Sequence, residues 1–415
     1  MNIRYLLHNA YGIGGTIRTV FNQANALCAT HDVEIASVYR TSEVPAFTLD
    51  PRVRLVSVTD LRPDGSRWTD EAGTNSRLWR KTRRMPNPMP HGRDFRYKRW
   101  DPQVDLLVIR YMRAQEKGTV LISTRPALNL LSAWFGPRKL IRIGQDHMNY
   151  RSYRLRLQAQ IKRAYPRLDA VSVLTQADLA DYREALGDAV RLVRIPNGIP
   201  ARTGAPDAER DRTLIAAGRL ERQKGFDLLI ESFVPVHEKH PDWQLNIFGD
   251  GKWRKKLTAM IAERGLDEVV HLRGTTRNLD AELTRSSIFV LSSRKEGLPM
   301  VLLEAMNAGL PVVSFDCPTG PADVVDDGGN GVLVPAEDLE GLAAGMSRLI
   351  ENSQEREAMG LAARATGAQY EMHVIAAHWE KLFAELTGRT AGEPKIPAQR
   401  VSQESAEESA RESRR

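Results

Sequence analysis

Two cations in the second half of the sequence have the spacing and surroundings of a phosphate-binding pair. Arg219 and Lys224 lie in GRLERQKG, after a predicted strand and before a predicted helix. The N-terminus of a helix favours an anion, an arginine offers a bidentate fork and a lysine offers a point charge. The pair would therefore suit a diphosphate. The alternative is two solvated cations in a surface turn.

Two carboxylates follow, eight positions apart in the chain. Pro299 favours the first turn of a helix, which places Glu296 on the preceding loop and Glu304 about one and a half turns inside the helix. Because Glu304 has apolar neighbours, its carboxylate should be partly buried and should need donors such as vicinal sugar hydroxyls. The alternative is a carboxylate at a helix N-terminus for Glu296 and an exposed position for Glu304.

Glycine turns and one histidine also follow predicted strands. Gly249 and Gly251 lie in FGDG, and Gly14 and Gly15 lie in GIGGT after the first predicted strand. Glycine lets a backbone approach a ligand or a helix closely, although neither turn is a full dinucleotide-binding motif. His147 follows a strand as well, and a loop histidine bonded to a backbone carbonyl is its structural alternative.

These side chains need a scaffold, and the first half of the chain predicts an α/β one. Helical patterns separate short β-branched runs, which is typical of a mostly parallel sheet with helices on both faces. We predict strands at 3–7, 33–38, 53–58, 120–123, 140–143, 170–174 and 192–195, and helices at 16–29, 126–133 and 176–184.

A second alternating series follows a turn-rich linker at residues 199–212. We predict strands at 213–217, 244–248, 269–272, 288–292, 311–314 and 331–334, and helices at 226–238, 252–263, 279–286, 300–308 and 339–352. Each half is therefore expected to be a doubly wound sheet. Such sheets bind ligands at the carboxyl ends of their strands, so two facing sheets would form an interdomain cleft.

The pattern also sets domain boundaries. We predict an N-terminal domain at 1–198, a C-terminal domain at 213–370 and a last helix at 371–386 that is a candidate to cross back to the first domain. An irregular basic insertion is expected at about 59–101, which is rich in Pro, Gly, Arg and Asn and lacks periodicity. A disordered tail is expected at 387–415, where no aromatic residue occurs.

The composition fits a globular protein with two domains. The 415 residues are 42% hydrophobic and 27% charged. No apolar run approaches the roughly 18–20 residues of a membrane helix, and the start is too short in its apolar part for a signal peptide. Cys28 and Cys317 lack metal-ligand spacing. We therefore expect a cytoplasmic protein without a metal site.

The net charge of +7 is distributed unevenly. From Arg77 to Arg113 there are eleven Lys and Arg against three Asp and Glu, and from Arg151 to Arg167 there are six basic residues and no acidic ones. Such stretches bind nucleic acid, anionic lipid or a phosphorylated substrate, or they form solvated surfaces. Because no zinc module or RNP motif accompanies them, we do not expect nucleic acid as a partner.

Four segments in order resemble the family 4 retaining glycosyltransferases of the GT-B fold: GRLERQKGFD (218–227), IFGDG (247–251), SSRKEGLPMVLLEAMNAGLPVV (292–313) and NGVLVP (330–335). The resemblance covers about residues 1–386 and is strongest in the second half. It implies that Arg219 and Lys224 neutralise the donor diphosphate. It further implies that Glu304 binds the ribose and that Glu296 binds hydroxyls of the donor sugar.

The resemblance also implies weaker donor contacts. The backbone of Gly297, Leu298 and Pro299 would contact the sugar, and the nucleotide base would lie near Thr275 and Arg277. Gly14 and Gly15 would lie on a loop that faces the donor phosphates and the acceptor, Gly249 and Gly251 would belong to the donor site, and His147 would lie close to the transferred sugar. Pro299 replaces a commoner small residue, which leaves the sugar open. Asn197 matches a turn at the interdomain hinge, for which we expect a structural role.

The acceptor is suggested by the CPTGP segment at 317–321. It resembles family members that decorate teichoic acids or extend polyprenyl-linked saccharides, whose acceptors are anionic and lie near a membrane. We therefore expect Arg18, Arg96, Lys98 and Arg99 on the acceptor side. We also expect peripheral association with the inner face of the cell membrane, where each surface cation adds about 1 kcal/mol.

The expected reaction transfers a hexosyl unit from a nucleotide sugar with retention, and family frequency favours UDP over GDP. We assign catalytic roles to Arg219, Lys224, His147 and Glu296. Since the sequence has no D-x-D motif, the two cations would replace a metal at the leaving phosphate, and no cofactor is expected. The family implies a front-face mechanism, in which that phosphate accepts the acceptor's proton.

Two other functions compete with this one. The first is a sugar-nucleotide epimerase of the same fold, and the E-x7-E and R-x4-K spacings argue against it. The second is a nucleotide-sugar-binding protein without activity. A donor site with all its parts argues against that function.

Overall fold

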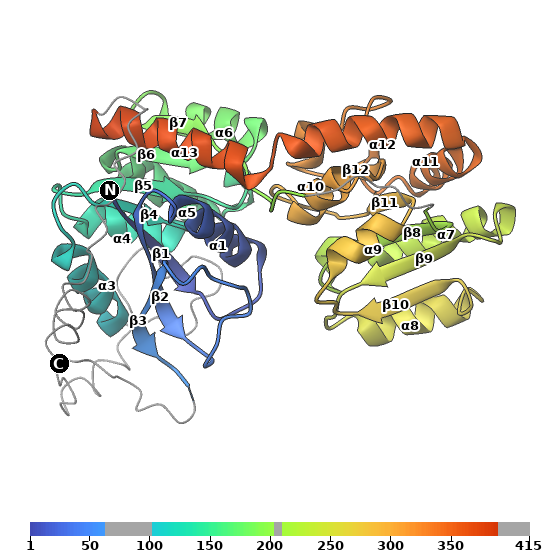
Figure 1. The fold of residues 1–415 in the computed structure, drawn as a ribbon, viewed down its shortest axis with the longest axis horizontal. Helices are drawn as coiled ribbons and strands as arrows, with labels where there is room; N and C mark the ends of the chain where they lie inside the picture. The colour runs from blue at the N-terminus through green and yellow to red at the C-terminus, as the bar shows by residue number, and fades with distance from the viewer. Residues whose placement is uncertain (63–101, 203–209, 389–415) are drawn as a thin grey trace, which may run out of the picture.

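The computed structural model describes residues 1–62, 102–202 and 210–388 of the chain. These residues form two α/β domains, one on each side of Figure 1, and the chain passes between them twice. Residues 63–101, which hold most of the predicted insertion, and residues 389–415 of the predicted tail lie outside the described residues.

The N-terminal domain contains a parallel sheet of seven strands in the order β3-β2-β1-β4-β5-β6-β7. Its strands are β1 (Asn2–Asn9), β2 (Asp32–Arg40), β3 (Arg54–Asp60), β4 (Val120–Ser123), β5 (Ile141–Gln145), β6 (Ala170–Val173) and β7 (Arg191–Arg194). Its helices include α1 (Gly15–Leu27), α3 (Pro102–Ala114), α4 (Pro126–Phe135), α5 (Leu155–Ala164) and α6 (Gln176–Leu186).

Alternation of side chains along β1 explains why both faces of this sheet are covered. Ile3, Tyr5 and Leu7 are buried in one apolar cluster with α1. Leu6 points to the other face and is buried with residues of α3 and α4. Successive side chains of a strand point to opposite faces, so a run of consecutive apolar residues is what a sheet buried on both sides requires.

The C-terminal domain repeats this design with six parallel strands in the order β10-β9-β8-β11-β12-β13. Its strands are β8 (Thr213–Ala217), β9 (Gln244–Phe248), β10 (Val270–Gly274), β11 (Ile288–Leu291), β12 (Val312–Asp316) and β13 (Gly331–Pro335). Its helices are α7 (Phe226–Lys239), α8 (Arg254–Glu263), α9 (Leu279–Arg285), α10 (Met300–Asn307), α11 (Leu339–Glu351) and α12 (Ser353–Ala368). Both sheets confirm the predicted doubly wound α/β class.

The last described helix, α13 (Met372–Thr387), returns to the N-terminal domain and lies along it in Figure 1. Ile375, Trp379 and Phe383 are buried in the same apolar cluster as β1 and α1. The segment that leads back into α13 pairs with the segment around Ile199, where the chain first leaves the N-terminal domain. The amide of Ile199 donates to the carbonyl of Tyr370 at 2.9 Å, and the amide of Met372 donates to the carbonyl of Ile199 at 2.7 Å.

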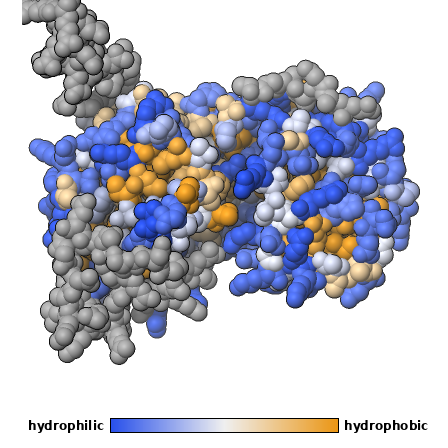
Figure 2. Space-filling model, turned by 60° about the horizontal axis from the view of Figure 1, so that its bottom comes forward, coloured by the Kyte–Doolittle hydropathy of each residue, from blue (hydrophilic) through white to orange (hydrophobic). Residues whose placement is uncertain are grey.

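The strand order reverses at β1 and β4 in the first sheet and at β8 and β11 in the second. Loops that leave neighbouring strands in opposite directions separate there, which makes these points the usual ligand sites of such sheets. The surface in Figure 2 is mostly hydrophilic, with hydrophobic side chains gathered in smaller areas of each domain. No helix among the described residues is long and apolar enough to cross a membrane.

Candidate functional site

The centre of the site is a contact between the two loops at the switch point of the C-terminal sheet. The amine Nζ of Lys224, after β8, lies 2.6 Å from the carboxylate Oε1 of Glu296, after β11. The hydroxyl of Ser293 donates to the same oxygen at 2.6 Å. Both charged side chains are largely buried, with 16% of Lys224 and 7% of Glu296 exposed. The sequence predicted the two groups but not that they form a pair.

Further bonds hold these two loops together. The amide of Arg294 donates to the carbonyl of Gln223 at 2.8 Å, and the side chain of Gln223 donates to the carbonyl of Lys295 at 2.9 Å. The guanidinium of Arg294 makes a bidentate contact with Asp227 at 2.8 and 2.9 Å. Because of that pairing, the pKa of Asp227 is lowered despite its burial. Arg294 and Asp227 therefore fix the spacing between Lys224 and its loop partner, a role that sequence spacing did not indicate.

Arg219 leaves the end of β8 toward solvent. Its side chain is about half exposed and lies 3.4 Å from the carboxylate of Glu221. An exposed pair of this kind contributes little and rearranges readily. The guanidinium can therefore be recruited by an anion at the switch point.

Glu304, the second of the two predicted carboxylates, lies on α10, and only 12% of its side chain is exposed. Burial raises its pKa, and the guanidinium of Arg18 acts in the opposite direction. Nη2 of Arg18 lies 2.7 Å from Oε1 of Glu304. The sequence placed Arg18 on the acceptor side, whereas the structure places it against the residue expected to bind the donor ribose.

The segment Gly297–Pro299 lies at the contact between the two domains. A Cβ added to Gly297 would lie 3.0 Å from the carbonyl oxygen of His147, which follows β5 of the other domain. The side chain of Asn197 donates to the carbonyl of Leu298 at 3.1 Å. Leu298 and Pro299 are buried. These residues thus join the domains, and His147 lies beside the loop of Glu296.

His147 is electrostatically unusual. Burial lowers its pKa to about 3, and the positive charge of Arg125 adds to the effect. Its Nε2 has no hydrogen-bond partner among the described residues. The imidazole is therefore neutral near pH 7, and its Nε2 is buried without a partner among the described residues.

A buried aspartate fixes the loop that carries His147. Asp146 accepts hydrogen bonds from the hydroxyl of Tyr153 at 2.6 Å and from that of Tyr165 at 3.1 Å. The hydroxyl of Tyr182 contacts the same carboxylate. Tyrosines from three segments therefore hold the residue next to His147. Their positions in the sequence have no common spacing that would have revealed this network.

The segment Cys317–Pro321 of the C-terminal domain follows β12 and contacts the loop that carries Glu296. Thr319 has a positive φ of 61°, which a β-branched residue rarely adopts. Its hydroxyl donates to the backbone carbonyl of Glu296 at 2.8 Å, and the side chain of Asn149 from the N-terminal domain donates to it at 3.5 Å. Thr319 thus links the loop that carries Glu296 to the N-terminal domain.

The predicted glycines fall into two groups. A Cβ on Gly249, where φ is +136°, would lie 1.8 Å from the carbonyl oxygen of Gly218, and one on Gly251 would lie 2.5 Å from that of Leu220. These two glycines allow the loop after β9 to pack on the loop after β8. A Cβ on Gly14 or on Gly15 would meet nothing within 4 Å. The turn before α1 is therefore open.

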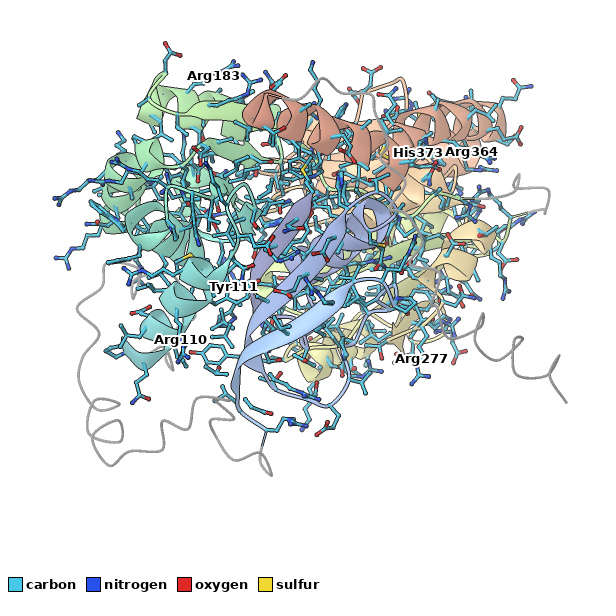
Figure 3. The ribbon with its side chains drawn as sticks, turned by 60° about the vertical axis from the view of Figure 1, so that its left-hand side comes forward. Arg110, Tyr111, Arg183, Arg277, Arg364 and His373 are labelled. Atoms are coloured by element: carbon cyan, nitrogen blue, oxygen red, sulfur yellow. The ribbon has the colours of Figure 1, made fainter. Side chains whose placement is uncertain are left out.

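The residues expected near the base are exposed. Thr275 and Arg277 lie on the loop between β10 and α9, and Figure 3 shows Arg277 at the surface of the C-terminal domain. The structure brings neither of them into contact with the pair of Lys224 and Glu296.

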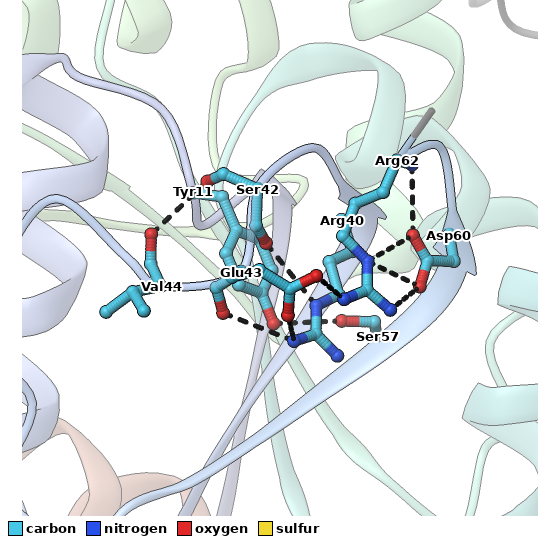
Figure 4. Close-up of polar contacts among 8 residues, drawn as sticks. All are labelled: Tyr11, Arg40, Ser42, Glu43, Val44, Ser57, Asp60 and Arg62. Carbon is cyan, nitrogen blue, oxygen red and sulfur yellow. Dashed lines mark hydrogen bonds and ion pairs between the residues drawn. The ribbon is translucent and has the colours of Figure 1, made fainter. Parts of the chain in front are cut away.

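The described part of the expected acceptor side ends in a polar cluster (Figure 4). Arg62 contacts Asp60 at 2.6 Å and also Glu43, which is bound by Arg40 at 3.1 Å. The guanidinium of Arg40 lies over the ring of Tyr11 on the loop before α1. Arg40 and Arg62 are therefore already paired with groups of the protein itself. Three other predicted acceptor residues lie outside the described residues: Arg96, Lys98 and Arg99.

Within the described ranges, no group of three or more His, Cys, Asp or Glu side chains is arranged to hold a metal ion.

Comparison with known proteins matches the C-terminal domain to a family. Residues 202–366 match the model described as glycosyl transferases group 1. Over 407 residues, 97% of this chain is 33% identical to an exopolysaccharide phosphotransferase of Streptomyces coelicolor. The chain spans only 42% of the length of that relative. Half of the chain, 52%, is 28% identical to 44% of a poly(ribitol-phosphate) alpha-N-acetylglucosaminyltransferase of Staphylococcus aureus.

The fold has solved counterparts. A crystal structure of Staphylococcus aureus TarM, in complex with fondaparinux, alpha-GlcNAc-glycerol and UDP, superposes with a TM-score of 0.72. The likeness covers 92% of this chain and 100% of that one at 16% identity, which shows a shared fold. The two facing α/β domains thus have the GT-B fold. Residues 202–366, which contain the switch-point pair of Lys224 and Glu296, match the glycosyl transferases group 1 model.

Proposed function

We propose that this chain is a retaining glycosyltransferase that moves a hexosyl unit from a UDP-sugar to an anionic or lipid-linked glycan of the cell envelope. The observation that carries the proposal is the 2.6 Å contact of Lys224 with Glu296 at the switch point. A nucleotide sugar has a dianionic diphosphate on one side of a single C–O bond and neutral hydroxyls on the other. The ammonium group of Lys224 suits the diphosphate side of that bond, and the carboxylate of Glu296 suits the sugar hydroxyls on the other side.

The donor would be held from both ends. An ammonium group has three N–H donors, so Lys224 can keep its contact with Glu296 while it binds the diphosphate. Arg219, which is half exposed, would join it there. Glu304 would accept hydrogen bonds from the ribose hydroxyls, and the exposed loop of Thr275 and Arg277 would lie near the base.

The chemical step would need no enzyme nucleophile. The acceptor oxygen attacks the anomeric carbon, the bond from that carbon to the donor phosphate breaks, and its electron pair goes to the phosphate. The same phosphate oxygen takes the acceptor's proton, so the new bond forms on the face that the old one leaves. Arg219 and Lys224 would stabilise the growing negative charge without a metal ion. His147 would contact the sugar as a neutral imidazole.

The names of the relatives support an anionic envelope polymer as acceptor. One similar protein is named for poly(ribitol-phosphate) and another for exopolysaccharide. All six basic side chains between residues 151 and 167 are exposed. Such a surface suits a phosphate-rich acceptor and also peripheral contact with an anionic membrane.

The test is turnover of a panel of UDP- and GDP-sugars in EDTA, with and without polyribitol phosphate or a polyprenyl-linked saccharide. We expect a UDP-sugar to be consumed only with acceptor, and the product to keep the donor's anomeric configuration by NMR. Lys224→Met should lower kcat at least about 100-fold, because the cation at the leaving phosphate is lost. Lys239→Met is the matched control, since Lys239 is exposed and pairs with Glu351 on the far helices.

Each part of the proposal has an outcome that contradicts it. Conversion of one nucleotide sugar into another without acceptor would identify an epimerase. Tight nucleotide-sugar binding without any turnover would identify a binding protein. Inversion at the anomeric carbon would exclude the front-face step, and loss of activity in EDTA would exclude metal independence.

A further inference from the structure

The first turn of α1 reaches across the domain boundary onto α10. The guanidinium of Arg18 meets Oε1 of Glu304 at 2.7 Å. The hydroxyl of Thr19 donates to Oδ1 of Asn197 at 3.1 Å and lies 3.3 Å from the sulfur of Met300. One turn later, the side chain of Asn22 donates to the carbonyl of Gly198 at 2.9 Å. The start of α1 is thus fixed against the hinge and the donor domain together.

Glu304 depends on this contact for its charge. It lies among the apolar residues of α10 with 12% of its side chain exposed. Two charged groups face it, Arg18 from α1 and Asp280 from α9. Burial and the negative charge of Asp280 raise the pKa of Glu304, and Arg18 lowers it. Within the described residues, Arg18 is the cation that pairs with this carboxylate.

The carboxylate of Glu304 has more acceptor positions than the contact with Arg18 uses. A carboxylate has two oxygens with about four acceptor positions. Arg18 approaches Oε1, so Oε2 remains to accept a hydrogen bond from a hydroxyl. A second possibility is that Arg18 occupies the place of the ribose and has to leave when the donor binds. The two arrangements predict opposite effects on affinity when Arg18 is removed.

We propose that Arg18 is a positioning residue for the donor ribose, supplied by the domain opposite to the one that binds the nucleotide. It holds one oxygen of Glu304 and keeps the carboxylate ionised and oriented, and the other oxygen accepts from the vicinal hydroxyls. The inference rests on the proposed function, because it takes Glu304 as the ribose ligand. It adds that recognition of the ribose requires both domains.

The experiment measures the binding of UDP and of 2′-deoxy-UDP to the full chain by calorimetry. The ratio of the two dissociation constants reports the hydrogen bond to the 2′-hydroxyl. We expect the wild type to prefer UDP about tenfold or more, as for a hydrogen bond to a charged group. Glu304→Gln should abolish the preference. Arg18→Met should reduce it to about twofold at pH 7, and Arg18→Lys should retain more of it.

The pH dependence separates positioning from simple damage to the fold. The preference requires ionised Glu304 and is lost as the pH falls through the pKa of that group. Without Arg18 the pKa is higher, so Arg18→Met should lose the preference at a higher pH than the wild type and regain it when the pH is raised. Arg54→Met is the matched control, since Arg54 pairs with Asp32 and Glu34 within the first sheet.

Three results would overturn the inference or its premise. An unchanged preference and an unchanged pH profile in Arg18→Met would overturn the positioning role while leaving the proposed function intact. Tighter binding of UDP by Arg18→Met would show that the arginine competes with the ribose. If the wild type does not bind UDP, the proposed function itself is overturned, since it takes a UDP-sugar as the donor.

Discussion

At the scale of single residues, His147 differs most from its ordinary behaviour. Histidine usually titrates near pH 6.5, but burial, reinforced by the charge of Arg125, lowers the pKa of His147 to about 3. Between these two pH values the unfolded chain binds more protons at this position than the folded chain. The free energy of unfolding should therefore fall as the pH decreases from about 6.5 toward 3.

This linkage can be measured by comparing thermal unfolding of the wild type and His147→Asn at pH 7 and pH 4.5. Between pH 7 and pH 4.5 the unfolding temperature should decrease more for the wild type than for the variant, because the variant has no imidazole to protonate at this position. The difference between the two losses isolates His147 from the other titrating groups. Equal losses would mean that the imidazole is protonated in the folded protein as easily as in the unfolded one.

The types and positions of the charged site residues could be predicted, but their partners could not. The sequence placed Glu296 on a loop and Glu304 inside a helix, and the structure agrees. The pairing of Lys224 with Glu296, and that of Arg18 with Glu304, joins residues far apart in the chain. Those pairs depend on which strands are neighbours and on how the domains meet, and no local pattern carries that information.

At the scale of elements, the loops after β8 and β9 are packed backbone to backbone. Gly249→Ala would place a methyl group 1.8 Å from the carbonyl oxygen of Gly218 at a φ of +136°. We expect this variant to lower the unfolding temperature of the protein by at least about 4 °C, since such strain costs roughly 2 kcal/mol or more. Differential scanning calorimetry would measure it.

The matched substitution is Gly15→Ala at the start of α1. A Cβ there meets nothing within 4 Å, and alanine favours a helix more than glycine does. Its unfolding temperature should match or exceed that of the wild type. If both alanine variants unfold at the same temperature as the wild type, the loops after β8 and β9 do not require a glycine at Gly249.

Strands were easier to predict than helices. Thr213–Ala217 and Gln244–Phe248 were predicted with the bounds that the structure shows. The first is a nearly continuous apolar run, which is the pattern of a strand buried on both faces. Three helices were not predicted: α3, α5 and α12. In α12 the buried stripe includes Gly360, Ala363 and Gly367, whose small side chains give a weak helical period. A Cβ on Gly367 would lie 2.4 Å from the amide nitrogen of Asn307, so close packing on α10 explains the small residues.

At the scale of the whole molecule, the first half of α5 presents charge and an apolar side chain together. Leu155 is 81% exposed, and Arg154 and Arg156 on either side of it are exposed as well. By contrast, Arg167 lies with its guanidinium 3.7 Å from the centre of the Trp134 ring. We therefore expect the start of α5 to contact an anionic membrane surface.

Sedimentation with vesicles tests this expectation. The protein should bind phosphatidylglycerol vesicles at about 50 mM salt and be released at about 500 mM, because salt screens exposed charges. Arg156→Gln should weaken binding about fivefold, which corresponds to roughly 1 kcal/mol for one cation. Arg264→Gln in the other domain, which removes an exposed pair with Glu231, is the control. Binding that does not change with salt, or equal binding to phosphatidylcholine, would contradict the prediction.

The return of α13 has a consequence for the synthesis of the protein. Trp379 and Phe383 complete an apolar cluster whose other members lie in β1 and α1. At about 5–20 residues per second, the ribosome adds α13 roughly 20 to 80 seconds after β1. The C-terminal domain receives its own last helix, α12, before that moment. The domain that is translated first is therefore the second to be completed, and for most of its synthesis the nascent chain carries a sheet face that α1 covers without α13.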